Sequence, residues 1–362
     1  MADAAANDSP PAPQARSARD LLTRRLADIV CLPASQVAPA ERWITADVLE
    51  ELLRTAEPGL RRKVAMRLAQ QADAPAALLR RLACDEYEIA KPILERSDAL
   101  TDFDRMEVAR KGTVAHRLSL ARREAVSETV TAALVAMGDE PVLMALLRNE
   151  GALLAPQTMD RLMQVAAENP EIARLLIRRF ELRPAQAFAL FWDCGHMERK
   201  QILDRFAVAR AVLQDAAADV FPMAAQEAEP DEMTGRVLAY IDRRQRDRAA
   251  NDGSVYGGLE GAVETASRRG VTHALADEIC RLAQIQPGLL ERMLDDFGGE
   301  PLAVMTKATG MSRQHYHMLM GLPGRDASPI AVEHGQLVFD TLSVDKAQTV
   351  LRYWDWSFRL SL

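Results

Sequence analysis

Apolar residues recur along most of this chain at the spacing of amphipathic helices. The first clear example is Leu21, Leu22, Leu26, Ile29 and Val30, which fall on one face of a helix of 3.6 residues per turn. Similar blocks follow almost without interruption, and the alternation typical of half-buried strands is missing. The pattern therefore predicts α-helices throughout.

From about residue 57 the blocks form a repeat. Five segments open alike, 27 to 29 residues apart, at Glu57, Asp85, Gly112, Asp139 and Glu168. Each contains an apolar helical face, a short break and a second such face. A helix pair of this length cannot bury its apolar face alone, so neighbouring pairs must stack. The sequence predicts an all-α fold: a HEAT-like α-solenoid of short helix-pair repeats followed by a C-terminal helical region.

Prolines mark the expected helix starts. Proline is favoured at the first helical position, because its missing N–H would have no partner there and its φ is already set. Six prolines stand where a first or second helix of a repeat should begin: Pro58, Pro75, Pro141, Pro156, Pro170 and Pro184. Pro92 lies inside an expected helix, Glu86–Arg96, where it should kink the helix or remove one hydrogen bond.

Composition shifts suggest where the parts of the chain begin and end. Residues 1–17, rich in Ala, Pro and Ser, are expected to form a disordered tail, and residues 18–221 the solenoid, with Met197–Phe221 as one long helix. The polar, proline-flanked stretch 222–231 is a predicted linker. Residues 232–362 are expected to form the C-terminal helical region, either as a cap on the solenoid or as a separate domain.

Several runs of residues resemble a known family. The runs are DAPAALLRRLACDEYEIAKPILERSDALTDFD, ARREAVSETV and LLRNEGALLAPQTMDRLM. They are similar to a bacterial, mostly alphaproteobacterial, family of all-helical HEAT-like proteins known as a domain of unknown function. The resemblance covers residues 20–215 well and the C-terminal part more loosely. It implies the fold and carries over no catalytic residue.

Composition and charge narrow the class of protein. The chain has 362 residues, 48% hydrophobic and 27% charged, with a formal charge of −7, which argues against a protein that mainly coats nucleic acid. No secretory signal and no apolar run of about 18 residues is visible, so a cytoplasmic protein without membrane contact is expected. The four cysteines form no CxxC pair, which favours free, reduced thiols.

Arginine doublets recur along the repeats. They are Arg61-Arg62, Arg80-Arg81, Arg122-Arg123 and Arg178-Arg179. A basic ridge for acidic partners is one interpretation, but residues 57–185 contain 20 Lys and Arg against 19 Asp and Glu, a net of only +1. We therefore favour a structural role for the doublets.

The order of charges along the repeats supports that structural role. Acidic residues open the predicted helices and arginines close them, as the helix dipole favours. Antiparallel neighbours then place Arg96 near Asp98, Arg123 near Glu124 and Arg179 near Glu181. The charges along each edge should largely cancel.

Residues 301–320 resemble a helix-turn-helix. Gly310 would form the turn, Met311 would be buried, and residues 312–319 would form the recognition helix. DNA contacts would then come from four side chains: Arg313, Gln314, His315 and His317. Thr306 at a position that usually holds a smaller residue, and the acidic flanks, count against this interpretation.

Catalytic and metal-binding signatures are weak. His315 and His317 point to different sides of a helix, and Cys194-Gly195-His196 has no second pair of metal ligands nearby in the sequence. The glycine-rich segment 257–261 lacks the lysine and the spacing of a phosphate-binding loop. We expect no catalytic residue, no metal and no cofactor, and hence a protein that is not an enzyme.

Aromatic residues gather at the C-terminus, at Tyr353, Trp354, Trp356 and Phe358. The last helix either docks on the C-terminal core or presents an anchor to a partner, and docking is favoured because exposed aromatics promote aggregation.

The leading functional prediction is a non-enzymatic protein–protein interaction scaffold or regulatory adaptor that binds an unidentified protein partner. Its candidate partner-binding residues are Arg61, Arg62, Arg80, Arg81, Arg122, Arg123, Tyr353, Trp354 and Trp356. One alternative is nucleic-acid binding, by the solenoid groove or the Gly310 turn. The other is an enzyme with a pocket between the solenoid and the C-terminal region, near Cys194 or His196. The sequence leaves the oligomeric state open.

Overall fold

The computed structural model describes residues 13–32, 36–209, 211–227, 231–241, 251 and 253–360, and within these ranges every regular element is a helix. The all-α prediction is confirmed. The chain divides into two compact units, Met1–Glu181 (unit 1) and Leu182–Leu362 (unit 2). The sequence-based boundaries at residues 221 and 231 stay predictions, and residues 228–230 of the predicted linker lie outside the described residues.

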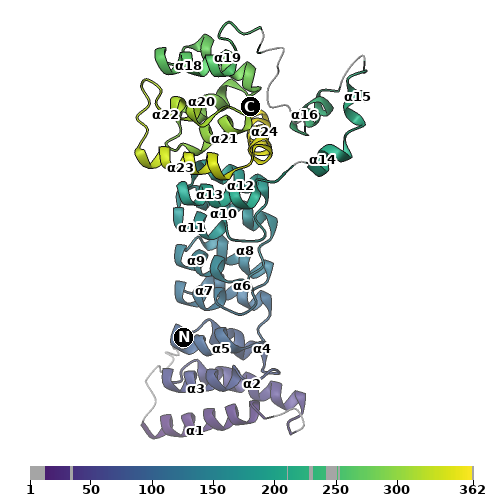
Figure 1. Cartoon of the computed structure of the whole chain (residues 1–362). Coiled ribbons are helices and arrows are strands. Elements are labelled where there is room, and N and C mark those ends of the chain that lie inside the picture. The colour runs from purple at the N-terminus through teal and green to yellow at the C-terminus, as the bar shows by residue number, and fades with distance from the viewer. Residues whose placement is uncertain are drawn as a thin grey trace, which may run out of the picture. The chain divides into compact units, whose positions relative to one another are not determined.

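Unit 1 consists of helices that pack in two rows. Figure 1 shows the odd-numbered row on the left and the even-numbered row on the right. The odd row and its bounds are α1 (Pro13–Val30), α3 (Pro58–Leu68), α5 (Tyr87–Arg96), α7 (Val114–Ala121), α9 (Glu140–Arg148) and α11 (Pro170–Leu176). The even row is α2 (Pro39–Leu53), α4 (Ala76–Ala83), α6 (Asp102–Lys111), α8 (Glu128–Met137) and α10 (Pro156–Glu168).

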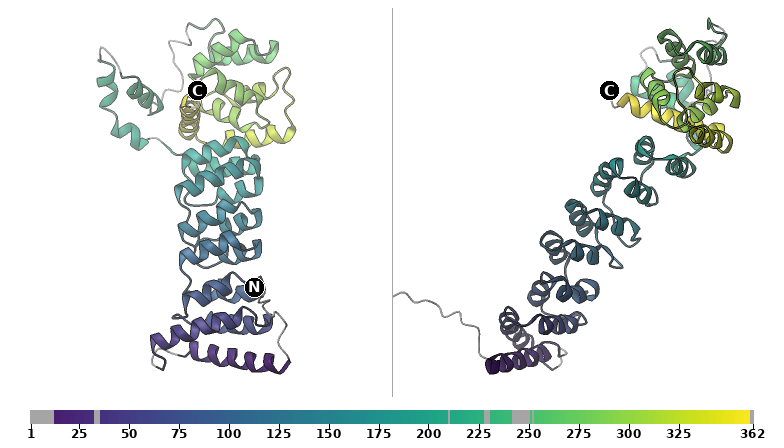
Figure 2. Two further views of the ribbon diagram at one scale, coloured as in Figure 1. Left: turned by 180° about the vertical axis from the view of Figure 1, so that it is seen from behind. Right: turned by 90° about the vertical axis from the view of Figure 1, so that its left-hand side faces the viewer.

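Helices of the same row pack on one another along the chain, without a break in the odd row and with one break, between α4 and α6, in the even row. In the odd row α1 contacts α3, and the contacts continue through α5, α7 and α9 to α11. In the even row α2 contacts α4, and α6, α8 and α10 follow one another in the same way. The right-hand view of Figure 2 looks along these helices and shows the pairs in sequence order.

Leucines form the core of this packing. Twelve leucines in the described part of unit 1 are fully buried, and they come from nine helices: Leu49, Leu53, Leu68, Leu78, Leu79, Leu82, Leu94, Leu120, Leu134, Leu146, Leu162 and Leu176. Complete burial of such a side chain contributes about 1.5–3 kcal/mol relative to exposure. Because these leucines come from successive helices, each helix pair depends on its neighbours to keep its apolar face away from water.

The prolines mark helix starts as predicted. Pro58, Pro156, Pro170 and Pro184 are first residues of helices; Pro141 is the second residue of α9, and Pro75 is the N-cap of α4. The chain remains helical through Pro92 in α5, although Pro92 has no N–H to donate. The N-terminal helix begins at Pro13, within the stretch predicted as a disordered tail, and residues 1–12 of that stretch lie outside the described residues.

Unit 2 is also helical, with the following elements: α12 (Pro184–Leu190), the 3₁₀ helix η1 (Phe191–Asp193), α13 (His196–Phe206), α14 (Ala211–Ala216), α15 (Val220–Ala224), α16 (Glu232–Ile241), α18 (Leu259–Arg269), α19 (His273–Ala283), α20 (Pro287–Asp295), α21 (Glu300–Ala308), α22 (Arg313–Met320), α23 (Pro329–Thr341) and α24 (Val344–Leu360). Its centre is α21, which contacts α20, α22, α23 and α24. Every residue of α21 except Lys307 is buried.

The single long helix predicted over Met197–Phe221 is wrong. Three helices, α13, α14 and α15, occupy this stretch. The backbone leaves the helical conformation at Ala207, where ψ is 105°, and both Phe206 and Ala207 are buried. Packing of these two side chains therefore overrides the helical pattern of the local sequence.

Asp104 offers a test of the unit 1 packing. Its side chain is 1% exposed and accepts hydrogen bonds from the Thr101 backbone N–H, from the Thr101 hydroxyl and, at 2.6 Å, from Arg80 Nε. Burial by itself would raise the pKa of Asp104, but these hydrogen bonds and the Arg80 charge outweigh it and lower the pKa. The carboxylate therefore stabilises the fold above its unfolded-state pKa, and this contribution disappears as the pH falls through the folded-state pKa.

We predict that Asp104→Asn lowers the free energy of unfolding by about 1–3 kcal/mol at neutral pH, because the Arg80 charge loses its buried partner. The difference from the wild type should shrink as the pH falls toward the folded-state pKa. Urea unfolding followed by circular dichroism at a series of pH values measures both effects. Asp98→Asn is the control, since Asp98 is 91% exposed and its loss should change stability by less than about 1 kcal/mol.

Candidate functional site

The arginine doublets of unit 1 divide into structural and exposed members. Arg61 Nη1 donates to both carboxylate oxygens of Asp85, at 2.7 and 2.8 Å, across two successive repeats. Arg80 Nε donates one hydrogen bond to Asp104, at 2.6 Å, and so joins α4 to α6. Arg62 is exposed, Arg81 is half-buried, and neither has an ion pair among the described residues. Within each doublet, one arginine therefore joins neighbouring repeats.

The loops that follow α5, α7, α9 and α11 are joined to one another by side chains. Arg123 donates to Leu94 O at 2.8 Å and to Asp98 at 3.0 Å. Asn149 in turn donates to Ala121 O at 2.8 Å and to Arg123 O at 2.7 Å. These bonds hold successive loops along one edge of unit 1.

Arg179 continues this series. Its guanidinium donates to Asn149 O at 2.7 Å and to Ala152 O at 2.6 Å, and it pairs with Glu181 at 2.6 Å. The predicted proximity of Arg179 to Glu181 is confirmed. Arg123 pairs with Asp98 of the preceding repeat rather than with the adjacent Glu124, which is exposed.

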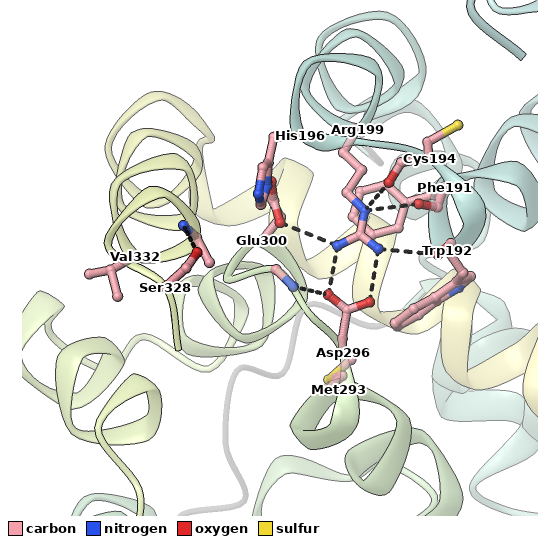
Figure 3. A network of polar contacts seen from close by, with 12 residues as sticks. Phe191, Trp192, Cys194, His196, Arg199, Met293, Asp296, Glu300, Ser328 and Val332 are labelled. Carbon is pink, nitrogen blue, oxygen red and sulfur yellow. Dashed lines mark hydrogen bonds and ion pairs between the residues drawn. The ribbon is translucent and has the colours of Figure 1, made fainter. Parts of the chain in front are cut away.

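A dense polar cluster among the described residues of unit 2 surrounds Arg199 of α13, whose side chain is 0% exposed (Figure 3). Its two terminal nitrogens donate to the two carboxylate oxygens of Asp296 at 2.6 and 2.8 Å, and Nη1 also lies 3.3 Å from Glu300 Oε2. Nε donates to the carbonyl oxygens of Phe191 and Cys194 at 3.1 and 2.9 Å. The guanidinium therefore connects α13 to the segment between α20 and α21.

Aromatic rings enclose the same guanidinium. Its central carbon lies 4.2 Å from the Phe297 ring centroid and 5.0 Å from that of Phe191. Burial alone would lower the pKa of Arg199, but the hydrogen bonds and charges of Asp296 and Glu300 outweigh burial and raise it. The arginine is consequently a permanent buried cation facing two carboxylates.

His196 extends the cluster toward the surface. Its Nδ1 lies 2.5 Å from Glu300 Oε1, and its ring stacks in parallel on His334 with centroids 4.6 Å apart. A histidine held by a carboxylate is also an arrangement found in general-base catalysis. Here Glu300 also faces Arg199, so its carboxylate joins two residues of α13 to α21, and the stack on His334 adds α23 to the contact.

Cys194, the other residue of the predicted triplet, is buried, and burial raises the pKa of its thiol to about 12. The thiol therefore stays protonated at neutral pH and is not an activated nucleophile. Among the described residues, no group of three or more His, Cys, Asp or Glu side chains is placed to hold a metal ion.

The helix-turn-helix candidates lie in the predicted local structure. Gly310 has a φ of +72°, Met311 is buried and Ser312 caps α22. Arg313 pairs with Asp340, and His315 Nδ1 lies 2.9 Å from the Ser312 hydroxyl. The other two candidates, Gln314 and His317, are exposed. Two of the four proposed base-reading side chains are thus engaged within the protein.

The C-terminal helix packs on unit 2 through its aromatic residues. Trp354 is 1% exposed, and its ring lies 4.8 Å from Phe191 and 5.0 Å from Trp192, centroid to centroid. Tyr353 and Trp356 are half-buried, and the side chain of Phe358 lies outside the described residues. Trp354 is therefore a core residue and is not available as a surface anchor for a partner.

Sequence reasoning did not find the Arg199 cluster. Asp296 and Glu300 lie about a hundred residues from Arg199, and they appeared in the sequence only as acidic flanks of the helix-turn-helix candidate. No spacing rule links such distant residues. The pair Gly298-Gly299 was the only local signal, because a side chain at Gly298 would collide with Glu300 and Arg199.

A family model described as an uncharacterised protein conserved in bacteria (DUF2336) matches residues 89–352. The chain belongs to this family. The matched range begins in α5 and includes most of unit 2, which the sequence-based resemblance covered only loosely. No curated protein and no solved structure matches the chain. Within the part of the chain that is described, no helix is long and apolar enough to cross a membrane.

We predict that Arg199→Ala lowers the free energy of unfolding by about 3–5 kcal/mol, because it leaves two buried carboxylates without their cation. Chemical denaturation of the full chain measures the loss. Lys200→Ala is the matched control on the next residue of α13, where an exposed pair with Asp204 contributes about 0.3–0.5 kcal/mol. A loss of less than about 1 kcal/mol for Arg199→Ala would contradict a structural role for the cluster.

Thiol labelling tests the burial of the cysteines. Burial raises the pKa of the Cys84, Cys194 and Cys280 thiols, in the last two to about 12 and about 11, but Cys84 is exposed whereas Cys194 and Cys280 are buried. Iodoacetamide at mildly alkaline pH should modify Cys84 in the folded protein and reach Cys194 and Cys280 only after denaturation. Peptide mass spectrometry identifies the sites, and Cys84→Ser should leave the half-buried Cys31 as the one site labelled before denaturation.

Proposed function

We propose that this protein is a non-enzymatic scaffold that binds another protein through unit 1, and that unit 1 is a HEAT-like α-solenoid. Two rows of helices support the solenoid: the odd row is in contact from α1 to α11, and in the even row α2 contacts α4 and α8 contacts both α6 and α10. Such stacks present long surfaces suited to extended protein ligands. In this proposal the chain acts in the cytoplasm, catalyses no reaction and holds no cofactor.

The exposure of aromatic side chains in unit 1 is the observation that carries this proposal. Unit 1 has four aromatic residues, and three of them are mostly exposed: Trp43 at 73%, Phe103 at 65% and Phe180 at 71%. Unit 2 buries large rings such as Phe191, Tyr316 and Trp354, and among its described residues Phe297, at 58%, is the one mostly exposed aromatic. Exposed aromatics are costly to a protein that stays alone in water, and they contribute much of the binding energy at protein interfaces.

The surroundings of Phe180 fit an interface. Phe180 lies beside a hollow of about 520 Å³ whose lining includes the exposed Arg148 and Arg178 and the apolar Leu147 and Leu175. Aromatic residues and arginine are both enriched at protein interfaces, and here a ring and two exposed guanidinium groups lie together.

Site-specific photo-crosslinking in the native cells tests the proposal. Benzoylphenylalanine at position 103 or 180 replaces an exposed ring with a reactive one and should yield a covalent adduct with a discrete protein. The same group at Val255, an exposed residue of unit 2, should yield none. The scaffold proposal fails if positions 103 and 180 give no protein adduct, or if all three positions give the same set.

A further inference from the structure

One edge of unit 1 carries an exposed arginine in each of four successive repeats. Arg96 and Arg148 are the last residues of α5 and α9, Arg122 is the C-cap of α7, and Arg178 follows the C-cap of α11. All four are exposed, and none has an ion pair among the described residues. We call this set the arginine edge.

Side-chain hydrogen bonds between successive loops fix the positions of the arginine edge. The residue that follows each of Arg122, Arg148 and Arg178 donates a hydrogen bond to the preceding repeat. These bonds run from Arg123 to Leu94 O, from Asn149 to Ala121 O and from Arg179 to Asn149 O. A backbone contact adds to this alignment, since Val126 N–H donates to Gly151 O at 3.0 Å. The exposed arginines therefore project from a fixed row of loops.

The charge of this edge is positive. The four exposed arginines and the two that follow Arg122 and Arg178 make six arginines. The carboxylates of the same loops are four: Asp98, Glu124, Glu150 and Glu181. Two of these carboxylates, Asp98 and Glu181, are already paired with Arg123 and Arg179. Glu124 and Glu150 are exposed and oppose the four arginines of the edge, which leaves a net of +2.

The hollow beside Phe180 lies on the same edge. Arg148 and Arg178, two successive members of the arginine edge, both line it, with Leu147, Leu175 and Phe180 as its apolar part. Glu150 is the one carboxylate in its lining. A ligand there meets two guanidinium groups and an apolar surface together.

We propose that the arginine edge binds an extended acidic segment of a partner protein, with a carboxylate at every third residue and an apolar side chain in the hollow beside Phe180. Packed helices lie about 8–10 Å apart, and an extended chain advances about 3.3 Å per residue, so three residues span one repeat. Bidentate arginine–carboxylate pairs suit this contact. The inference rests on the proposed scaffold function and names the chemistry of its partner.

Fluorescence anisotropy with two labelled synthetic peptides tests the proposal on the full chain. The first peptide has Glu at every third position, Ser and Pro between, and one Phe; the second has the same composition with all Glu residues at one end. The first should bind more tightly, and binding should weaken as salt increases. Equal affinity for both peptides, or no binding of the first, overturns the proposed spacing.

Charge-matched variants locate the contact. The triple variant Arg122→Gln, Arg148→Gln, Arg178→Gln should weaken binding of the first peptide roughly tenfold, since three exposed ion pairs are lost. The control Arg25→Gln, Lys63→Gln, Arg110→Gln removes the same charge from other exposed positions of unit 1 and should leave affinity unchanged. Circular dichroism verifies that both variants are folded. Equal weakening in both variants shows general attraction only and overturns the site.

A single-stranded oligonucleotide separates a protein ligand from a polyanion. If the oligonucleotide binds as tightly as the first peptide and the triple variant weakens both equally, the acidic-peptide proposal is overturned. The crosslinking experiment tests the scaffold function independently of these binding measurements. A protein adduct at position 180 together with failure of the first peptide would keep the scaffold and reject the acidic segment.

Discussion

The burial of one apolar face per helix against the next helix pair is the constraint on which unit 1 depends. No pair is long enough to enclose its own leucines, so each fully buried leucine is covered by residues from neighbouring helices. This dependence explains why polar contacts in unit 1 run between repeats. Arg61 with Asp85, Arg80 with Asp104 and Arg123 with Asp98 all join residues about 25 positions apart.

Unit 2 buries its apolar helix faces around a central helix, α21, and a buried ion cluster. Nearly all of α21 is buried, and Glu300 at its first position would be costly there without a cation. Arg199 supplies that cation, and Asp296 and three backbone carbonyls use the remaining donors of its guanidinium. The cluster fixes where α13 meets α21, which a purely apolar contact would specify less precisely.

The two units therefore differ in which side chains they expose for binding other molecules. Unit 2 buries Phe191, Tyr316 and Trp354 and engages Arg199 and His196 internally, although Phe297 is 58% exposed. Unit 1 exposes Trp43, Phe103 and Phe180 and four arginines along one edge. Buried charge in unit 2 specifies the fold, and exposed charge in unit 1 is available for recognition. The arginine doublets combine both roles, since Arg123 and Arg179 join repeats while the preceding Arg122 and Arg178 face solvent.

The sequence by itself determined the helical class, the repeat and most helix starts. These features are local: apolar spacing, proline at the first turn and acid-to-arginine order act within one helix. Only the tertiary structure decided that Arg123 reaches Asp98 rather than Glu124, that the chain breaks at Ala207, and that Arg199 meets Asp296 and Glu300. Those outcomes depend on side chains from distant segments competing for the same buried space, and no pattern within a single stretch of sequence records that competition.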